Sequence, residues 1–303
     1  MPRPPFRVLT VIALGACAGR APAPTDAPAP SPRPPAGATP TPAPSATTSW
    51  RFAWSPDVQA FAVRTEADVE RTGGGSASGG GAERERVESS AHVSLAVQPA
   101  GSGGTRAVVG RVDSLRVRAS ARVSGGADPA PAPPVGLRGS VSPRGAVRLD
   151  VDGTAAAGGC GTPTGASALT ALAVAREALP RVPAGTTPLT VGARWRDTVA
   201  TTTCAGPLPV SVQAIAAYEV ERQEGALLRV RRRANSTLRG QGFAGGQSVR
   251  VTGTGIADAT LLLDPARGVL RGVTGEGRTT MTMTIGTATH AFEQRTRVTV
   301  QAR

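Results

Sequence analysis

Residues 87–97 read VESSAHVSLAV, and every second position of this stretch, from Val87 to Val97, carries an apolar or small side chain. The positions between them are mostly polar. A period of two places the two sets on opposite faces of an extended chain, so the stretch predicts a β-strand with one apolar face and one wetted face. That arrangement is typical of antiparallel sheets.

The same period recurs along most of the chain after Ser49. It is found in residues 61–69, 115–123, 147–151, 228–238, 281–285 and 292–300. With weaker stretches included, about a dozen strands are expected. The predicted fold is therefore mainly β, a single antiparallel curved sheet or an open barrel.

One segment departs from this period. Leu169, Leu172, Arg176 and Leu179 stand at helical spacing, and Pro180 follows them as a stop. A single helix over about residues 166–179 is expected, which would cap an open barrel or lie in a curved sheet. Elsewhere, Pro143-Arg144-Gly145 predicts a tight turn between two strands.

The N-terminus carries an export signal. Two arginines precede an apolar run that is too short to span a bilayer, which needs about 20 residues. The run ends in Leu14-Gly15-Ala16-Cys17, which resembles the lipobox of bacterial lipoprotein precursors. In that family the cysteine is lipidated and becomes the new N-terminus. The resemblance implies a signal peptide over residues 1–16, a membrane anchor at Cys17 and, with Ala18 following, sorting to the outer membrane on its periplasmic side.

Residues 17–48 predict a tether between the anchor and a folded domain. They consist mainly of Ala, Pro, Thr and Ser, and lack the apolar content to form a core. Proline favours an extended polyproline II spacer. The antiparallel β domain is therefore expected over residues 49–303.

A second resemblance is short. Leu179-Pro180, a loop, and then Val191-Gly192-Ala193-Arg194-Trp195 are similar to a segment of uncharacterised all-β bacterial envelope lipoproteins. It covers about 20 residues, and in those lipoproteins a long pair of strands follows. It implies an antiparallel β domain without an assigned activity.

Two cysteines remain after Cys17. Cys160 and Cys204 form an even pair in an exported chain, where oxidation is permitted. A Cys160–Cys204 disulfide is expected, with two free thiols as the alternative.

The composition excludes several chemistries. All 34 basic residues are arginine, so the chain has neither a phosphate-loop lysine nor a Schiff-base lysine. His92 and His290 are its only histidines and are expected at the surface. Because no nucleophile motif accompanies them, we expect no catalytic residues, no metal site and no cofactor, and the protein is not expected to be an enzyme.

The formal net charge of +13 suggests an anionic partner. Export and the 3% aromatic content argue against nucleic acid, which leaves anionic lipids or acidic envelope polymers. Arg229, Arg231 and Arg233 are aligned on one face of a predicted strand and are the candidate anion-binding residues. The alternative is a solvated arginine-rich surface without a specific role.

Inward-facing positions are mostly small, so a curved sheet could keep a cavity. Candidate ligand-binding residues are Arg232, which falls on an apolar face and needs an anionic partner, and the apolar residues Met281, Met283, Trp195, Phe61 and Phe292.

Two functions are consistent with these features. The first is a tethered protein that holds a lipid or another apolar molecule, which resembles lipoprotein-carrier and lipid-carrier envelope proteins in general layout. The second is a structural or interaction lipoprotein with a filled core, in which Arg232 pairs with a carboxylate.

Overall fold

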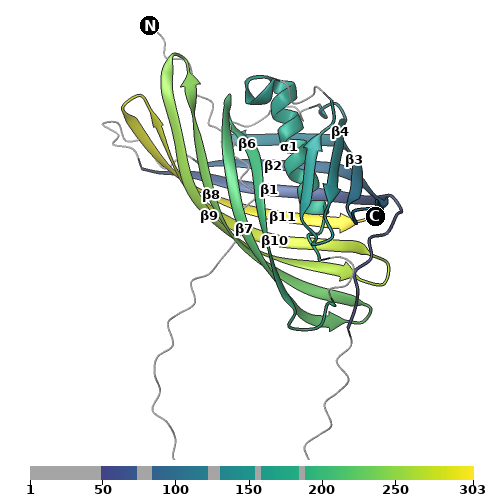
Figure 1. Cartoon of the computed structure of the whole chain (residues 1–303). Helices are drawn as coiled ribbons and strands as arrows, with labels where there is room; N and C mark the ends of the chain where they lie inside the picture. Colours follow the sequence, from purple (N-terminus) through teal and green to yellow (C-terminus); the bar gives the residue numbers. More distant parts are fainter. Residues whose placement is uncertain (1–48, 74–83, 122–129, 154–157, 184–187) are drawn as a thin grey trace, which may run out of the picture.

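The computed structural model describes residues 49–73, 84–121, 130–153, 158–183 and 188–303. Within them, all eleven strands belong to one antiparallel sheet that curls into a half-barrel, and one α-helix lies on its concave side (Figure 1). The predicted fold class is confirmed. The lipobox, the tether and the glycine-rich segment 74–83 lie outside the described residues.

The strands vary from short edge strands to long central ones. Their bounds are β1 Gln59–Gly73, β2 Arg84–Ala100, β3 Arg106–Ala121, β4 Val135–Val141, β5 Val147–Val151, β6 Arg194–Ala205, β7 Leu208–Glu224, β8 Leu227–Ala244, β9 Gln247–Asp264, β10 Val269–Ile285 and β11 Ala288–Ala302. A short 3₁₀ turn, η1 (Gly159–Gly161), precedes the helix α1 (Pro163–Ala178).

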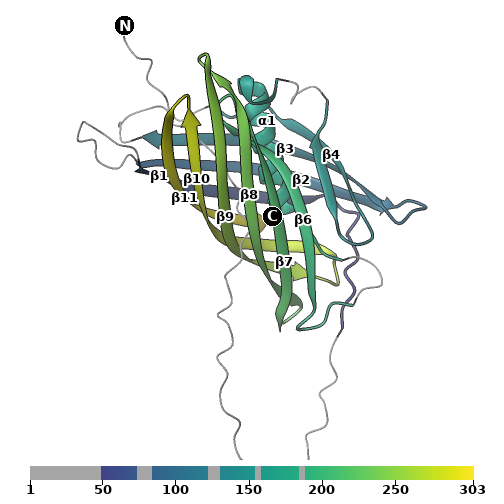
Figure 2. The same ribbon diagram turned by 60° about the vertical axis from the view of Figure 1, so that its left-hand side comes forward.

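The strand order is β5-β4-β3-β2-β1-β11-β10-β9-β8-β7-β6. Two meanders, β1–β5 and β6–β11, therefore join along the pairing of β1 with β11, for example at Val63 and Val300. The segment containing α1 connects the two outermost strands, β5 and β6. Figure 2 shows how the curl leaves α1 on the concave side.

The alternation predicted for these strands is present. In β7 every second residue from Leu208 to Val220 is buried and the residues between them are mostly exposed. One difference occurs in β3, where Ser114 has a φ of 56° and the register with β2 shifts. Leu115 is buried as expected, but Val117 is 36% exposed, because β4 pairs with β3 only as far as Val112.

The helix begins earlier than expected. The Thr162 side chain accepts a hydrogen bond from the Gly165 N–H at 3.1 Å, and Pro163 occupies the first turn, where its missing N–H costs nothing. The buried side of the helix is rich in alanine, including Ala168, Ala171 and Ala175. Small side chains allow the helix axis to approach the sheet closely.

The tight turn predicted at Pro143-Arg144-Gly145 connects β4 to β5. Gly145 has a φ of 81° and donates its N–H to the Ser142 carbonyl. Among the described residues, no helix is long and apolar enough to cross a membrane.

Candidate functional site

The concave face carries two separate apolar clusters. The first contains buried side chains of α1, of β1–β4 and of the nearer ends of β7–β11, together with Phe52 and Trp54 from the segment before β1. The second lies toward the other ends of β7–β10. Its members are Ala205, Leu208, Val210, Val212, Leu238, Val249, Val251, Met281 and Met283, with Ala244, Ile285 and Phe292 packed against it.

The two clusters differ in the secondary-structure elements that contribute residues to them. Helix residues such as Leu172 and Ala175 belong to the first cluster, whereas every described member of the second lies on or between strands. Met281 and Met283 lie here, and Phe292 packs beside them. Three of the six predicted ligand-binding residues therefore come together.

The other three belong to the helix side of the sheet. Phe61 is buried in the first cluster, and Trp195 packs at its margin. The Trp195 ring stacks on Tyr218 with 5.2 Å between ring centroids. Burial raises the pKa of the Tyr218 phenol, although the positive charges of Arg232 and Arg181 oppose this effect. The six predicted residues thus do not line one cavity.

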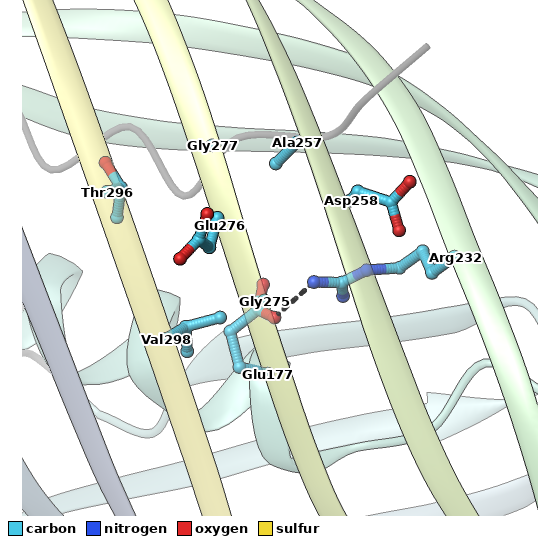
Figure 3. A pocket seen from close by; sticks show the side chains of 9 residues that line it. All are labelled: Glu177, Arg232, Ala257, Asp258, Gly275, Glu276, Gly277, Thr296 and Val298. Atoms are coloured by element: carbon cyan, nitrogen blue, oxygen red, sulfur yellow. Dashed lines mark hydrogen bonds and ion pairs between the residues drawn. The ribbon is translucent and has the colours of Figure 1, made fainter. Parts of the chain in front are cut away.

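Arg232 has the carboxylate partner that its position requires. Its Nη2 lies 2.8 Å from Oε2 of Glu177 on α1, and Figure 3 shows the guanidinium pointing toward that carboxylate. The pocket beside this pair, lined by Ala257 and Gly277 among others, has a free volume of about 10 Å³. That is about the space for one water molecule, so this part of the concave side is filled.

A second buried ion pair fixes the chain where it leaves the helix. Arg181 Nη1 lies 2.6 Å from Asp197 Oδ2 on β6, and the Arg181 carbonyl accepts a hydrogen bond from the Trp195 indole at 2.7 Å. The sequence pattern did not identify this pair. The only signal was an aspartate at an inward position of a strand.

A row of polar residues lies beside the second cluster. Paired positions on four neighbouring strands place Ser236, Gly255, Thr279 and Gln294 side by side across the concave face. The Ser236, Thr279 and Gln294 side chains are at most 3% exposed. No described residue hydrogen-bonds Ser236 Oγ or Gln294 Oε1. Sequence analysis did not single out this polar row, because its members come together only through the sheet register.

The arginines proposed to bind anions do share the convex face of β8, but they have carboxylate neighbours. Arg231 contacts Asp258 on β9 at 2.6 Å, and Arg233 approaches the same carboxylate at 3.4 Å. Arg229 lies 3.3 Å from Glu221 on β7. The stripe is therefore part of a mixed-charge network.

Cys160 and Cys204 form a disulfide with a Cα–Cα distance of 5.4 Å. It ties η1 to β6, so it holds the start of the α1 segment against the edge of the sheet. Cys17 lies outside the described residues.

The histidines lie on β2 and β11. His92 is exposed, whereas His290 is only partly exposed and its Nδ1 accepts a hydrogen bond from Arg71. Burial, and then the charge of Arg71, lower the pKa of His290. Within the described part of the chain, no three His, Cys, Asp or Glu residues are grouped to hold a metal ion.

No protein-family model matches the chain, and no curated protein matches its sequence.

Proposed function

We propose that the protein is a lipid-anchored binding protein of the cell envelope, held at the periplasmic side of the outer membrane through Cys17. In this proposal the half-barrel holds an acyl chain, or a similarly shaped apolar molecule, along the second cluster. Anionic lipids are the natural source of such chains at this location, and nucleic acid is not an expected partner. The supporting observation is a cluster of buried apolar strand residues to which no described helix residue contributes.

The length of that surface fits one acyl chain. From Ser236 to Gly242, β8 spans about 20 Å at ~3.4 Å per residue. The hydrocarbon core of a bilayer is ~30 Å thick, so a chain in one leaflet extends about 15 Å. An extended chain that runs along the strands would therefore lie within the second cluster.

The side chains of this surface also suit an apolar ligand. Met281 and Met283 are flexible and polarisable, which allows them to adapt to irregular shapes. Leu238 and Val251 provide apolar walls on the neighbouring strands. By contrast, the Arg232–Glu177 pair and its small pocket suit the alternative, a structural lipoprotein with a filled core.

A binding assay separates the two functions. A fluorescent acyl probe is titrated into the full chain carrying Cys17→Ala, which removes the anchor. Val212→Trp would place a large ring within the second cluster, where Val212 is 3% exposed, and should weaken binding about tenfold. Ile215→Trp on the same strand is the control, because Ile215 is 58% exposed on the opposite face.

Because Val212→Trp could disturb folding, Met283→Ser provides a milder test of the same surface, and circular dichroism checks each variant. Binding that is absent in the unsubstituted chain, or equal in all variants, would favour the structural alternative. Native mass spectrometry of the protein from its own membrane would reveal any ligand that co-purifies.

The anchor has its own test. Cys17→Ala should release the protein from the membrane fraction or leave an uncleaved precursor. A Cys17→Ala protein that fractionates with membranes at the mature mass would overturn the lipidation proposal.

A further inference from the structure

The convex face of the sheet has an open hollow where the two meanders join. Its free volume is about 740 Å³, and it lies over β11, β1, β2 and β3, which are neighbours in the sheet (Figure 1). Ala62 on β1 lines the hollow and pairs with Gln301 on β11 and with His92 on β2. A methyl group between two longer side chains leaves space above the sheet, so the hollow follows from the strand register.

A strained residue determines what β3 contributes to this hollow. Ser114 has a φ of 56°, which is unfavourable for a residue with a side chain, and the register with β2 shifts beside it. Val112 and Leu115 are both buried although they are three positions apart, so this bulge reverses the alternation of β3. Without the bulge, position 116 would share the inward face with Val112. With it, Arg116 is exposed on the convex face and lines the hollow.

The hollow contains more positive than negative side chains. Arg64, Arg116 and Arg303 line it, whereas Glu66 is the only carboxylate side chain among its described lining residues. Glu66 is shared, because it lies 2.9 Å from Arg64 and 2.7 Å from Arg86, which is outside the hollow. Within the described part of the chain, no carboxylate forms an ion pair with Arg116. The arginines of this hollow are thus less neutralised than those of β8.

Arg64 and Arg116 stand on either side of one short residue. Ser90 on β2 pairs with Arg64 on β1 and with Arg116 on β3, so the two arginine backbones are about 10 Å apart. Ser90 is exposed and too short to fill the gap between them. A phosphate group above Ser90 can accept hydrogen bonds from a guanidinium on each side, and the arginine fork suits phosphate oxygens.

Further donors surround the rest of the hollow. Ser114 and Thr299 supply hydroxyl groups, Gln301 an amide and His92 a ring nitrogen. Ligand sites commonly have volumes of about 300–1,000 Å³, so this hollow is large enough for more than a phosphate ion. Its polar lining favours a ligand that carries hydroxyl groups over an apolar one.

We propose that the hollow binds a phosphate monoester of a small polyol, such as a glycerol phosphate or a sugar phosphate. The phosphate lies above Ser90 between Arg64 and Arg116, and the hydroxyl groups lie above Ala62. This site is independent of the proposed acyl binding, because the second cluster occupies the opposite face of the sheet. A soluble phosphate ester and a lipid headgroup present the same chemistry to these residues.

Matched probes test the ligand class. Glycerol 3-phosphate is titrated by calorimetry into the full chain carrying Cys17→Ala, in buffer without phosphate, and glycerate and glycerol are titrated separately. Glycerol 3-phosphate should bind at least about fivefold more tightly than glycerate, because a phosphate monoester has three terminal oxygens and nearly two charges. The absence of saturable binding, or equally tight binding of glycerate, would overturn the proposal.

Two variants locate the site. Arg116→Gln removes the guanidinium that has no carboxylate partner and should weaken binding about tenfold. Arg239→Gln on β8 is its control, because Arg239 is exposed and the same charge is removed away from the hollow. Ala62→Phe fills the hollow without changing the charge and should weaken binding by a similar factor. Ala217→Phe, on the exposed face of β7, is the corresponding control.

The controls separate a built site from the general positive charge. Circular dichroism first checks that each variant is folded. If Arg239→Gln weakens binding as much as Arg116→Gln does, net charge alone accounts for the effect and the site is overturned. Unchanged binding in both Arg116→Gln and Ala62→Phe overturns it as well. Failure of the fluorescent acyl probe to bind would contradict the proposed function but not this site.

Vesicles distinguish the two sources of the phosphate. Phosphatidic acid carries a phosphate monoester, whereas phosphatidylglycerol carries a diester. Preferential co-sedimentation with phosphatidic acid vesicles, lost in Arg116→Gln, would support a lipid headgroup as the ligand. Binding of glycerol 3-phosphate without that preference would support a soluble phosphate ester in the same hollow.

Discussion

Arg232 on β8 and Glu177 on α1 form an ion pair across the concave side, with 2.8 Å between Nη2 and Oε2 and side chains only 16% and 12% exposed. Helix and sheet are thus joined by a partly buried charge pair as well as by the alanine-rich side of α1. Removing one partner of such a pair leaves a charge in a poorly solvated position, whereas removing both does not.

We therefore expect Glu177→Met to lower the free energy of unfolding by about 3 kcal/mol. The double substitution Glu177→Met with Arg232→Met should recover most of this loss. Urea unfolding of the single and double variants measures the coupling. Arg194→Met is the control, because Arg194 is 73% exposed in its pair with Glu219, and it should cost less than about 1 kcal/mol. A Glu177→Met variant as stable as the control would contradict a structural role for the buried pair.

The disulfide gives a second expectation. Cys160 and Cys204 are separated by 44 positions, and closing a loop of that length stabilises a fold by about 4 kcal/mol in the chain-entropy model. Replacing both cysteines by serine should lower the unfolding free energy by an amount of this order. In the parent protein, alkylation without reductant followed by mass spectrometry should label neither residue, and quantitative labelling of both would rule out the bond.

The fold was largely predictable because the sheet has one apolar and one wetted face, so a period of two is visible in single strands such as β2. The sheet register is not visible in this way. Ser236 and Gln294 are separated by 58 positions in sequence, yet lie in one row because four strands pair in a particular alignment.

For charged residues, the sequence indicated that a partner was required but not which residue supplies it. The apolar setting of Arg232 indicated an anionic partner, but Glu177 lies on a helix whose position against β8 no local pattern specifies. Likewise, Arg231 was correctly assigned to the wetted face of its strand, but its contact with Asp258, which lies opposite Arg233 in the register, follows only from the pairing of β8 with β9. The helix start was missed because the Thr162 cap and Pro163 precede the first periodic leucine.

The carboxylate partners of Arg229, Arg231 and Arg233 change the anion binding that we expect of these arginines. Because Asp258, Glu221 and Glu224 neutralise Arg229, Arg231 and Arg233, changing the three arginines to Gln should reduce binding to anionic vesicles less than about twofold. Vesicle co-sedimentation at low and high salt measures this, with lipid-free Cys17→Ala protein to remove the anchor. A large, salt-sensitive loss on substitution would restore the stripe as an anion-binding surface.

His290 provides a pH-dependent contribution to stability. Its Nδ1 accepts a hydrogen bond from Arg71, which requires the neutral ring, and burial followed by the Arg71 charge lowers its pKa below the usual value of about 6.5. Between the folded and unfolded pKa values the unfolded chain binds more protons, so stability rises with pH there. The contribution is complete above about pH 6.5 and is lost as the pH falls toward the folded pKa.

We accordingly expect the Tm of the full chain to fall between pH 7.5 and pH 5.5, and His290→Gln to flatten this dependence. The window suits the test because His92 and His290 are the only histidines, and carboxylates titrate mostly below it. His92→Gln is the matched control, because His92 is exposed on β2 and its replacement should leave the slope as in the parent protein. Equal slopes in the His290→Gln and parent proteins would mean that the contact with Arg71 does not favour the neutral ring.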